Sequence, residues 1–239
     1  MVLISHIKKF IFFKTKKTAS TTIENYFTKF CIKNPNSYID SHDHDELVTK
    51  YGVIGRRING KITSKYKFHV TTKPNKIRTY LGIDKFNNYL KFTIIRNPWD
   101  KMVSLFFFII NLEPKNYKLL NIKQWKVIFL NKKKNKVDNI QLFREWINLL
   151  DLQTMCIDWE EFTLNNKPCC DYYIHFENLE TDTKILCNKL GINFSGFNKS
   201  FKTNYRKDKD YKKYYDNYTK NRVQQGYKLF LEYFPYKFD

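Results

Sequence analysis

The sequence predicts an α/β fold with a central parallel sheet flanked by helices. Two short apolar runs, Phe10–Phe13 and Phe92–Ile95, have the composition of buried parallel strands, and each precedes polar residues and a helical pattern. Repeated strand, loop and helix units are typical of parallel sheets with crossover helices, where ligands gather at the carboxyl ends of the strands. The 239 residues contain no Pro/Gly/Ser-rich linker and no internal repeat, so we expect residues 1–239 to form a single domain.

The first strand, loop and helix unit covers Lys9–Cys31. Its helix is predicted to begin at Thr21, because Thr21-Thr22-Ile23-Glu24 fits the S/T-x-x-E capping box. Apolar residues at helical spacing share one face of this helix: Ile23, Phe27, Phe30 and Cys31. Residues 14–22 are therefore expected to connect a buried strand to a helix N-terminus.

This connecting loop has the chemistry of an anion-binding site. A helix N-terminus presents unpaired N–H groups at the positive end of the helix dipole, and Lys17 adds a positive charge. The loop also carries hydroxyl groups on Thr18, Ser20, Thr21 and Thr22. It is not a Walker A loop, because it has no glycine and its lysine comes at the start. The alternative is an ordinary turn with a solvated lysine.

The second unit places an arginine at the end of a strand. Asn97 suits the N-cap of the following helix, and Pro98 suits its first position. Asp100, at the third position, can hydrogen-bond back to the N-cap residue. Arg96 then stands at the edge of the sheet, where a guanidinium can bind a phosphate with two hydrogen bonds. Ser104 lies two turns beyond Asn97 on the same face of the helix, so its hydroxyl can point in the same direction as the Asn97 side chain. The alternative is an arginine paired to a carboxylate and a serine facing solvent.

A histidine precedes another short predicted helix. Pro74 suits the first turn of that helix, and Gly82 follows Leu81 as a stop signal. His69 therefore ends an extended segment just before a helix, which is a common position for a functional side chain. A structural histidine is the alternative.

Composition limits the class of protein. The net charge is +20, but abundant Lys, Asn, Ile, Phe and Tyr with few Gly is what an AT-rich coding sequence produces, so the charge is weak support for a nucleic-acid partner. Five cysteines without a C-x-x-C pair imply neither a disulfide framework nor a zinc site, and they fit a reduced compartment. No apolar run approaches the roughly 20 residues of a membrane span, so we expect a soluble, cytoplasmic protein without a signal peptide.

The two loop motifs resemble those of sulfotransferases that use 3′-phosphoadenosine 5′-phosphosulfate (PAPS). Residues 17–22, KTASTT, resemble the phosphosulfate loop P-K-T-A/G-[GS]-T-[ST], and residues 96–104, RNPWDKMVS, resemble the 3′-phosphate motif R-N-P-x-[DE]-R-x-x-S. Residues 171–179 are similar to the family's third-strand segment ending in F-E-N-L, and residues 211–239 resemble its closing helix. The resemblance thus covers most of the chain, and it implies a three-layer fold like that of P-loop kinases. In motif style it is closest to carbohydrate sulfotransferases of the Golgi and bacterial types.

The resemblance implies a role for each matching residue. The 5′-phosphosulfate of PAPS would lie in the loop formed by Lys17, Thr18, Ala19, Ser20, Thr21 and Thr22, and its 3′-phosphate against Arg96 and Ser104. Lys17 would stabilise charge on the bridging oxygen as the product 3′-phosphoadenosine 5′-phosphate (PAP) leaves. His69, which matches H-x-[ST]-x, would take the proton of the acceptor hydroxyl. Glu24 is a rival base and His175 a third candidate; no metal ion is required.

The sequence departs from the family pattern at three positions. Lys16 stands where the family often has Pro, Lys101 replaces the usual Arg, and His175 occupies a position that is commonly Arg. The first two changes leave the chemistry intact. The third leaves open what anchors the end of the third strand.

Three polar segments have alternative interpretations. The run Ser41–Glu46 (SHDHDE) offers metal ligands, but adjacent ligands rarely converge on one ion, so we interpret it as surface. Lys132–Lys134 fits a solvated loop, or a basic lip for an anionic sugar, since such loops can border the acceptor cleft in this family. Lys199–Lys213 could bind RNA, but we favour a cover for the adenine end of PAPS, because the family's chain returns there.

The sequence thus predicts sulfuryl transfer from PAPS to a hydroxyl of a carbohydrate-type acceptor, with no nucleic-acid partner. Two alternatives stay open. A kinase-like P-loop protein acting on a nucleotide or small molecule would need a Walker loop and a magnesium-binding acid, and neither stands at the expected place. A non-catalytic, basic nucleic-acid-binding protein would explain the charge but not the paired strand, loop and helix motifs.

Overall fold

The computed structural model describes residues 2–34, 45–57, 60–69, 72–111, 138–197 and 209–239. The chain divides into two compact units. Unit 1 comprises Met1–Ile95 and Asp158–Phe201, and unit 2 comprises Arg96–Ile157 and Lys202–Asp239. The predicted loop of residues 14–22 and His69 belong to unit 1, whereas Arg96 and Ser104 belong to unit 2.

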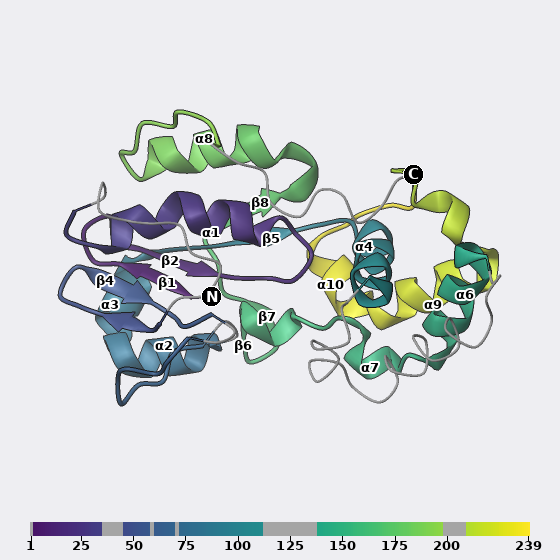
Figure 1. Ribbon diagram of the computed structural model, residues 1–239, viewed down its shortest axis with the longest axis horizontal. Helices are drawn as coiled ribbons and strands as arrows, with labels where there is room; N and C mark the ends of the chain where they lie inside the picture. The colour runs from purple at the N-terminus through teal and green to yellow at the C-terminus, as the bar shows by residue number, and fades with distance from the viewer. Residues whose placement is uncertain (1, 35–44, 58–59, 70–71, 112–137, 198–208) are drawn as a thin grey trace. The chain divides into compact units, whose positions relative to one another are not determined.

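Unit 1 is built on a six-stranded mixed sheet with the strand order β3-β4-β1-β2-β5-β8 (Figure 1). The strands are β1 (Leu3–Ser5), β2 (Phe10–Phe13), β3 (Leu47–Val48), β4 (Gly52–Ile54), β5 (Leu90–Ile95) and β8 (Tyr172–His175). Strands β2, β5 and β8 run parallel, with Phe12 opposite Phe92 and Phe92 opposite Tyr172. The predicted α/β fold with helices beside parallel strands is therefore confirmed.

The other half of the sheet is antiparallel, which the sequence did not predict. Strand β1 pairs with both β2 and β4, and β4 pairs with β3, in antiparallel register. Only His6–Lys9 connect β1 to β2. A connection this short can form a hairpin, whereas a parallel crossover needs a dozen residues or more.

Helices cover both faces of this sheet. Helix α1 (Ser20–Thr28), its 3-10 extension η1 (Lys29–Cys31) and helix α8 (Leu179–Lys189) lie on one side, and helices α2 (Pro74–Leu81) and α3 (Ile83–Asn88) lie on the other (Figure 1). A hairpin, β6 (Thr163–Leu164) and β7 (Lys167–Pro168), follows the 3-10 turn η4 (Trp159–Glu161). A second 3-10 turn, η5 (Phe176–Asn178), leads from β8 into α8.

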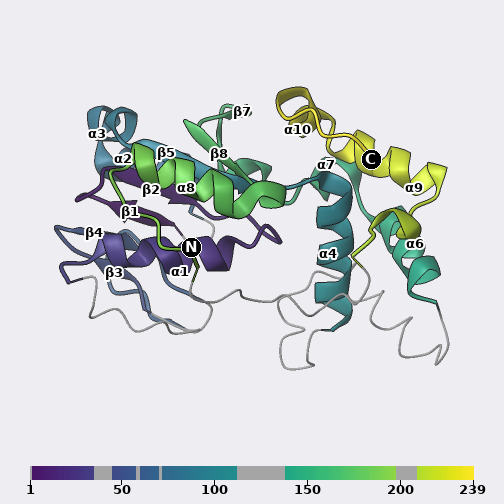
Figure 2. The same ribbon diagram turned by 90° about the horizontal axis from the view of Figure 1, so that it is seen from above.

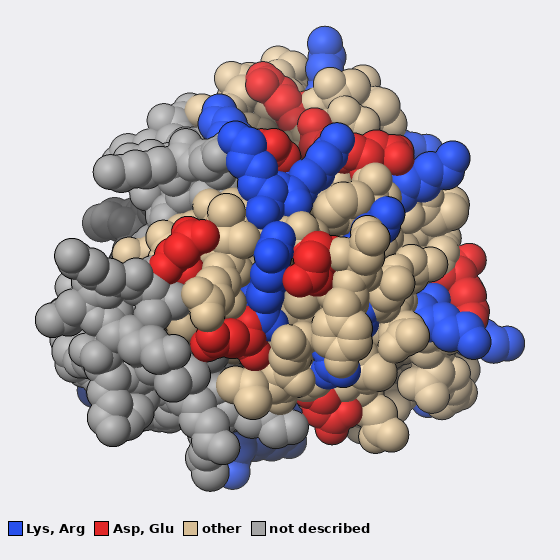
Figure 3. All heavy atoms as spheres, turned by 90° about the vertical axis from the view of Figure 1, so that its right-hand side faces the viewer, with Lys and Arg blue, Asp and Glu red and all other residues tan. Residues whose placement is uncertain are grey.

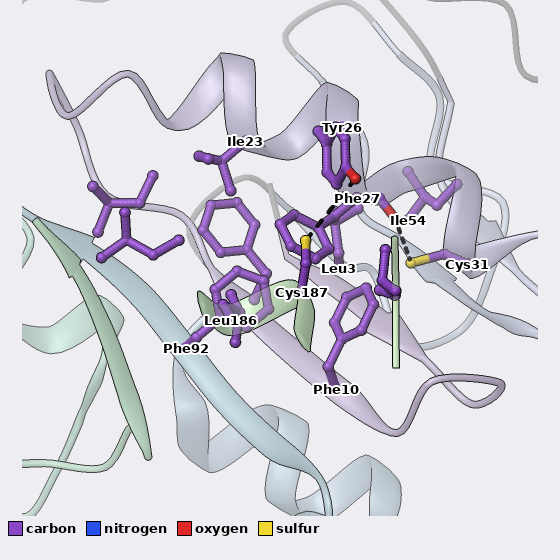
Figure 4. Close-up of a cluster of buried hydrophobic side chains, with 14 residues drawn as sticks. Leu3, Phe10, Ile23, Tyr26, Phe27, Cys31, Ile54, Phe92, Leu186 and Cys187 are labelled. Carbon is purple, nitrogen blue, oxygen red and sulfur yellow. Dashed lines mark hydrogen bonds between the residues drawn. The ribbon is translucent and has the colours of Figure 1, made fainter. Parts of the chain in front are cut away.

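The core of unit 1 lies between α1, α8 and the sheet (Figure 4). The ring of Phe27 meets that of Phe10 at 5.4 Å and that of Phe92 at 5.0 Å between centroids. The thiols of Cys31 and Cys187 are buried here and donate to Phe27 O and Tyr26 Oη, respectively. Burial raises the pKa of the Cys31 thiol, so this cysteine behaves as a core residue.

Unit 2 is helical. Its elements are α4 (Pro98–Ile110), α6 (Asn139–Leu149), α7 (Leu152–Met155), the 3-10 turn η6 (Lys212–Tyr214), α9 (Asn217–Gly226) and α10 (Lys228–Tyr233). Helix α9 contacts α4, α6 and α7 (Figure 2). Trp99 Nε1 donates to Lys220 O at 3.0 Å, and Tyr215 Oη donates to Trp99 O at 2.8 Å, so polar contacts fix α4 against the C-terminal segment.

Several predicted helix ends are confirmed and others are wrong. Asn97 caps α4 by accepting from the N–H groups of Trp99 and Asp100, and α2 begins at Pro74 as expected. The predicted single closing helix is wrong, because it breaks at Tyr227 into α9 and α10. In α6 the buried stripe is formed by Leu142, Phe143, Trp146 and Ile147.

No helix among the described residues combines the length and apolar character needed to span a bilayer. The five cysteines are free thiols.

The close approach of β4 to its neighbours gives a test of the fold. A Cβ atom at Gly52 would lie 2.3 Å from Ile4 O and 2.8 Å from Cys31 O, so neither backbone leaves room for a methyl group. We predict that Gly52→Ala lowers the free energy of unfolding by about 1–3 kcal/mol, measured by urea denaturation. The control Ile7→Ala, at a side chain 51% exposed beside the same strands, should change it by less than about 0.5 kcal/mol. Equal stability of the two variants would contradict this sheet arrangement.

Candidate active site

The loop between β2 and α1 is closed by its own hydroxyl groups. Thr15 Oγ1 donates to Ile94 O in β5 at 2.6 Å and lies 2.9 Å from Thr18 Oγ1. Ser20 Oγ donates to Thr15 O at 2.6 Å. The side chains of Thr18 and Ser20 are thus turned inward and buried, where they brace the loop. The sequence predicted that both hydroxyls contact the ligand, and it assigned no role to Thr15.

Two residues of this loop have left-handed backbone conformations. Lys17 has φ 59°, and Ala19 has φ 56° and ψ 18°. Each such conformation costs a non-glycine residue roughly 1–2 kcal/mol, so the surrounding hydrogen bonds must hold it. Left-handed residues in a turn can direct successive N–H groups to one side, which produces an anion-binding concavity. The loop therefore holds two left-handed residues without using glycine.

The predicted capping box at Thr21 is wrong. Helix α1 begins at Ser20, its N-cap is Ala19, and no side chain caps it. Ala19 O instead accepts from Thr22 N at 2.9 Å. Glu24 is unable to reach back to the cap because its carboxylate is engaged elsewhere.

Glu24 lies at the centre of a buried ionic cluster. Its carboxylate is fully buried, and Oε2 accepts from Lys14 Nζ at 2.5 Å and from Arg57 at 2.6 Å. Burial alone would raise the pKa of Glu24, but the surrounding cations, Lys14 and Arg57 among them, outweigh burial and hold the pKa at about 2. Such a carboxylate stays ionised and is a weak base. The cluster links Lys14, at the start of the loop, and Glu24, in α1, to Arg57, which follows β4.

A turn far along the sequence contacts the start of the loop. The backbone N–H of Lys16 donates to Asp158 Oδ2 at 2.8 Å. Two residues later, Glu160 forms an ion pair with Lys73 at the N-cap of α2. Glu161, the last residue of this turn, is 8% exposed. Burial raises the pKa of Glu161 to about 7, and the Asp158 charge adds to the shift, while Lys16 and Lys73 oppose it.

Sequence reasoning missed this acidic turn. Its signal is four residues, Asp158-Trp159-Glu160-Glu161, that place three acids together in a chain of net charge +20. The pattern lies more than 140 residues from Lys16 in sequence, and the contact becomes visible only in the fold.

His69 is half-buried and held on both sides. The backbone N–H of His69 donates to Thr72 Oγ1 at 2.7 Å, and its ring Nδ1 accepts from Arg56 Nε at 3.0 Å. Burial lowers the pKa of His69, and the charges of Arg56 and Lys76 lower it further, against the charge of Glu46. The ring is therefore neutral at pH 7. With Nδ1 accepting from Arg56, the proton of the neutral ring sits on Nε2.

Glu46 fixes the segment that leads to His69. Its buried carboxylate accepts from Thr63 N, Ser64 N, Ser64 Oγ and, at 2.6 Å, Phe68 N. Burial opposes ionisation, but these hydrogen bonds outweigh burial and lower the pKa of Glu46. The surface interpretation is therefore wrong for Glu46, whereas Ser41–His44 lie outside the described residues. No set of three His, Cys, Asp or Glu side chains within the described ranges could hold a metal ion.

The second predicted motif lies in unit 2, at the start of α4. Arg96 is buried, and its guanidinium pairs with Asp100 Oδ2 at 2.6 and 2.8 Å. Asp100 therefore pairs with Arg96, one helical turn before it. Asn97 Nδ2 donates to Lys237 O at 2.9 Å, which links the motif to the C-terminal segment, and Ser104 is half-buried on α4.

The end of β8 is anchored by His175, at the position where the sequence departs from the Arg that is common in the resembling family. His175 Nδ1 lies 2.8 Å from Asp182 Oδ2, which also accepts from His175 N at 2.7 Å. This pair closes the turn from β8 into α8. Lys132–Lys134 and most of Lys199–Lys213 lie outside the described residues.

Residues 1–237 match the protein-family model described as the Sulfotransferase family. The match covers nearly the whole chain and includes both loop motifs, the acidic turn and the C-terminal helices. Searches of the curated proteins and of the solved structures gave no match.

The Glu46 cluster gives a test of how the His69 segment is held. We predict that Glu46→Gln destabilises the protein by about 2–4 kcal/mol at pH 7, because an amide cannot accept from both pairs of donors. The stabilising effect of the carboxylate is present above its unfolded pKa and lost as pH falls through the lower folded pKa, so the two proteins should converge in acid. Urea denaturation at several pH values measures this difference.

The matched control is Asp45→Asn, at an exposed neighbour that accepts from Lys61 N. It should change stability by less than about 1 kcal/mol, since an exposed partner is easily replaced by water. A Glu46→Gln effect that stays constant across the pH range would contradict the assignment.

Proposed function

Because this chain belongs to the Sulfotransferase family, we propose that it moves a sulfuryl group from PAPS to a hydroxyl of a carbohydrate-type acceptor by in-line displacement. Family membership makes it an enzyme of sulfuryl transfer with PAPS as the donor. The observation that carries the proposal for this chain is the glycine-free loop of residues 14–19. This loop stands between a buried parallel strand and a helix N-terminus with Lys17 and Ala19 left-handed.

The proposed donor contacts begin in this loop. The 5′-phosphosulfate binds the backbone N–H groups and side chains of residues 17–22, at the positive end of α1. Lys17 lies in the loop, half-buried, and supplies the compact positive charge that a leaving phosphate requires. Because Thr18 and Ser20 turn their hydroxyls inward, they contribute chiefly through backbone N–H groups, whereas Thr21 and Thr22 head the helix.

Arg96 and Ser104 are proposed to bind the 3′-phosphate. Arg96 follows β5 directly in the chain, and β5 is the parallel neighbour of β2, which carries the phosphosulfate loop. The contact with Asp100 fixes the plane of the guanidinium, which favours bidentate binding of a phosphate. Ser104 lies two turns along α4 and adds a hydroxyl donor.

The chemistry that these residues perform is positioning and charge stabilisation. The acceptor oxygen forms a bond to sulfur while the bond from sulfur to the bridging oxygen breaks, and Lys17 stabilises the charge that moves onto that oxygen. His69 takes the proton from the acceptor hydroxyl. To accept at Nε2, its ring must carry the remaining proton on Nδ1, so Arg56 has to release Nδ1 in the reactive state. The proposed step requires no metal ion.

The proposed acceptor rests on motif style. The R-N-P-W-D sequence at residues 96–100 resembles that of carbohydrate sulfotransferases. The face of the molecule in Figure 3 carries Lys and Arg side chains among Asp and Glu side chains. Over the described residues of that one face the two signs of charge are interspersed, so this face gives no support to the alternative of a nucleic-acid-binding protein.

We predict that PAP binds the wild-type protein more tightly than ATP, measured by titration calorimetry. Arg96→Ala should weaken PAP binding by about tenfold to a hundredfold, because a hydrogen bond to a charged group contributes roughly 1.5–3 kcal/mol. Lys17→Ala should weaken it similarly. The control Lys167→Ala, at an exposed residue of β7, should bind PAP as wild type does. Equal affinity for ATP and PAP would contradict the proposed donor and favour a kinase-like protein.

A second prediction separates catalysis from binding. His69→Ala should lower kcat by about 10²–10⁴-fold in an assay of sulfuryl transfer to a panel of sugars, while the Kd for PAP stays within about twofold. Glu24→Gln should instead lower stability, because it leaves Lys14 and Arg57 without their carboxylate. A His69→Ala enzyme with unchanged kcat would exclude His69 as the base.

A further inference from the structure

The ring of His69 is held by Arg56, the second residue after β4. Arg56 Nε donates to His69 Nδ1 at 3.0 Å, and Arg56 Nη1 donates to Gly60 O at 3.1 Å. The backbones are paired as well, because Arg56 N donates to Phe68 O at 3.1 Å. Two neighbouring segments of unit 1 therefore bring the guanidinium and the imidazole together.

The partners of the Arg56 guanidinium are neutral. They are an imidazole nitrogen and a backbone carbonyl, and within the described ranges no carboxylate forms an ion pair with Arg56. Arg57, by contrast, donates to the carboxylate of Glu24 at 2.6 Å. A guanidinium binds an anion more strongly than a neutral acceptor, and often with two parallel hydrogen bonds. Arg56 is half-buried, so an anion that reaches it can take the guanidinium from His69.

The segment that carries Arg56 is anchored on the helix that follows the proposed donor loop. Arg57 Nη2 donates to Asn25 Oδ1 at 2.8 Å as well as to Glu24, and both acceptors lie in α1. The loop of residues 17–22 leads into the N-terminus of the same helix. The residue next to Arg56 therefore ties this segment to the helix at which the phosphosulfate is proposed to bind.

The contact with Arg56 determines what the His69 ring can do. A guanidinium only donates, so Nδ1 is the acceptor and the neutral ring carries its proton on Nε2. In this form neither nitrogen can take a proton, because the lone pair of Nδ1 is engaged and Nε2 is already protonated. The proposed base is thus blocked until the guanidinium leaves Nδ1.

We propose that Arg56 is a positioning residue for His69: its guanidinium holds the ring in the Nε2–H form, and an anionic group of a bound substrate takes the guanidinium and frees Nδ1. This inference rests on the proposed function, because it needs His69 to act as the base. Two sources have the required chemistry, the sulfuryl group of the donor and a carboxylate or sulfate of the acceptor.

The proton balance of this step is simple. When the guanidinium leaves, the ring exchanges its one proton with water and holds it on Nδ1. Nε2 then takes the proton of the acceptor hydroxyl, which gives the imidazolium. The base therefore becomes competent only when an anionic substrate is present.

A first experiment observes the His69 ring directly, by NMR of protein labelled with ¹⁵N in histidine. A His69→Gln variant identifies the His69 signals among those of the five histidines. In the free wild type, the ring should show a protonated Nε2 and a hydrogen-bonded Nδ1 without a proton. Arg56→Ala should show a mixture of both neutral forms. The control Arg78→Ala, at an exposed residue of α2, should match wild type.

Ligands added to the wild type then identify the anion. One sample receives PAPS without an acceptor, and another receives PAP with glucuronic acid or glucose 6-sulfate; PAP with glucose is the neutral control. A change of the Nδ1 signal with PAPS alone assigns the displacing anion to the donor. A change only with an anionic sugar assigns it to the acceptor.

These samples test the inference even if Arg56→Ala does not fold. An unchanged Nδ1 signal in every sample, with PAP bound, would overturn the inference and leave the proposed function standing. Failure of wild type to bind PAP would overturn both.

A second experiment uses the pH dependence of kcat/KM, which reports the free enzyme. Burial lowers the pKa of His69, Arg56 and Lys76 lower it further, and Glu46 opposes them, so loss of the Arg56 charge should raise this pKa. Because the base must be neutral, Arg56→Ala should lose activity at a higher pH than wild type.

The ratio of kcat/KM at pH 6 to that at pH 8 should fall by about threefold or more in Arg56→Ala. Arg56→Lys keeps the charge and should restore most of this ratio, and Arg78→Ala should match wild type. Identical pH profiles of wild type and Arg56→Ala would overturn the inference, since a purely structural contact would not move the profile.

Discussion

The structure of unit 1 depends on how the chain passes from β2 into α1. This connection has no glycine, yet Lys17 and Ala19 adopt left-handed conformations that are unfavourable for side-chain-bearing residues. Hydrogen bonds from three directions hold them: Thr15 to β5, Ser20 within the loop, and Asp158 to the N–H of Lys16. A turn held in this way keeps its N–H groups oriented before a ligand arrives, which reduces the entropy lost on binding.

Buried charge is distributed around this turn in two opposite ways. Glu24 is ionised, and its Oε2 pairs with both Lys14 and Arg57, so it stabilises structure and is a weak base. Glu161 is buried without such partners among the described residues and keeps a pKa of about 7. The two buried glutamates therefore differ in pKa because cations pair with the first and burial dominates at the second.

Local patterns predicted the parts of the fold that local forces determine. The apolar runs became β2 and β5, Asn97 capped α4, and Pro74 began α2, because strand burial, capping and proline geometry depend on a few adjacent residues. Contacts between distant residues were not predictable in the same way. Asp158 meets Lys16 and Glu46 meets Phe68 only after the sheet has formed, and the competing partners of Glu24 removed it from the predicted capping box.

We propose that the loop of residues 17–22 binds the 5′-phosphate end of the donor, and a crystal structure of the complex with PAP would test this. We predict that the 5′-phosphate lies within about 3 Å of Lys17 Nζ and of backbone N–H groups at the N-terminus of α1. A 5′-phosphate bound elsewhere, with this loop making no contact to it, would exclude the proposed donor site.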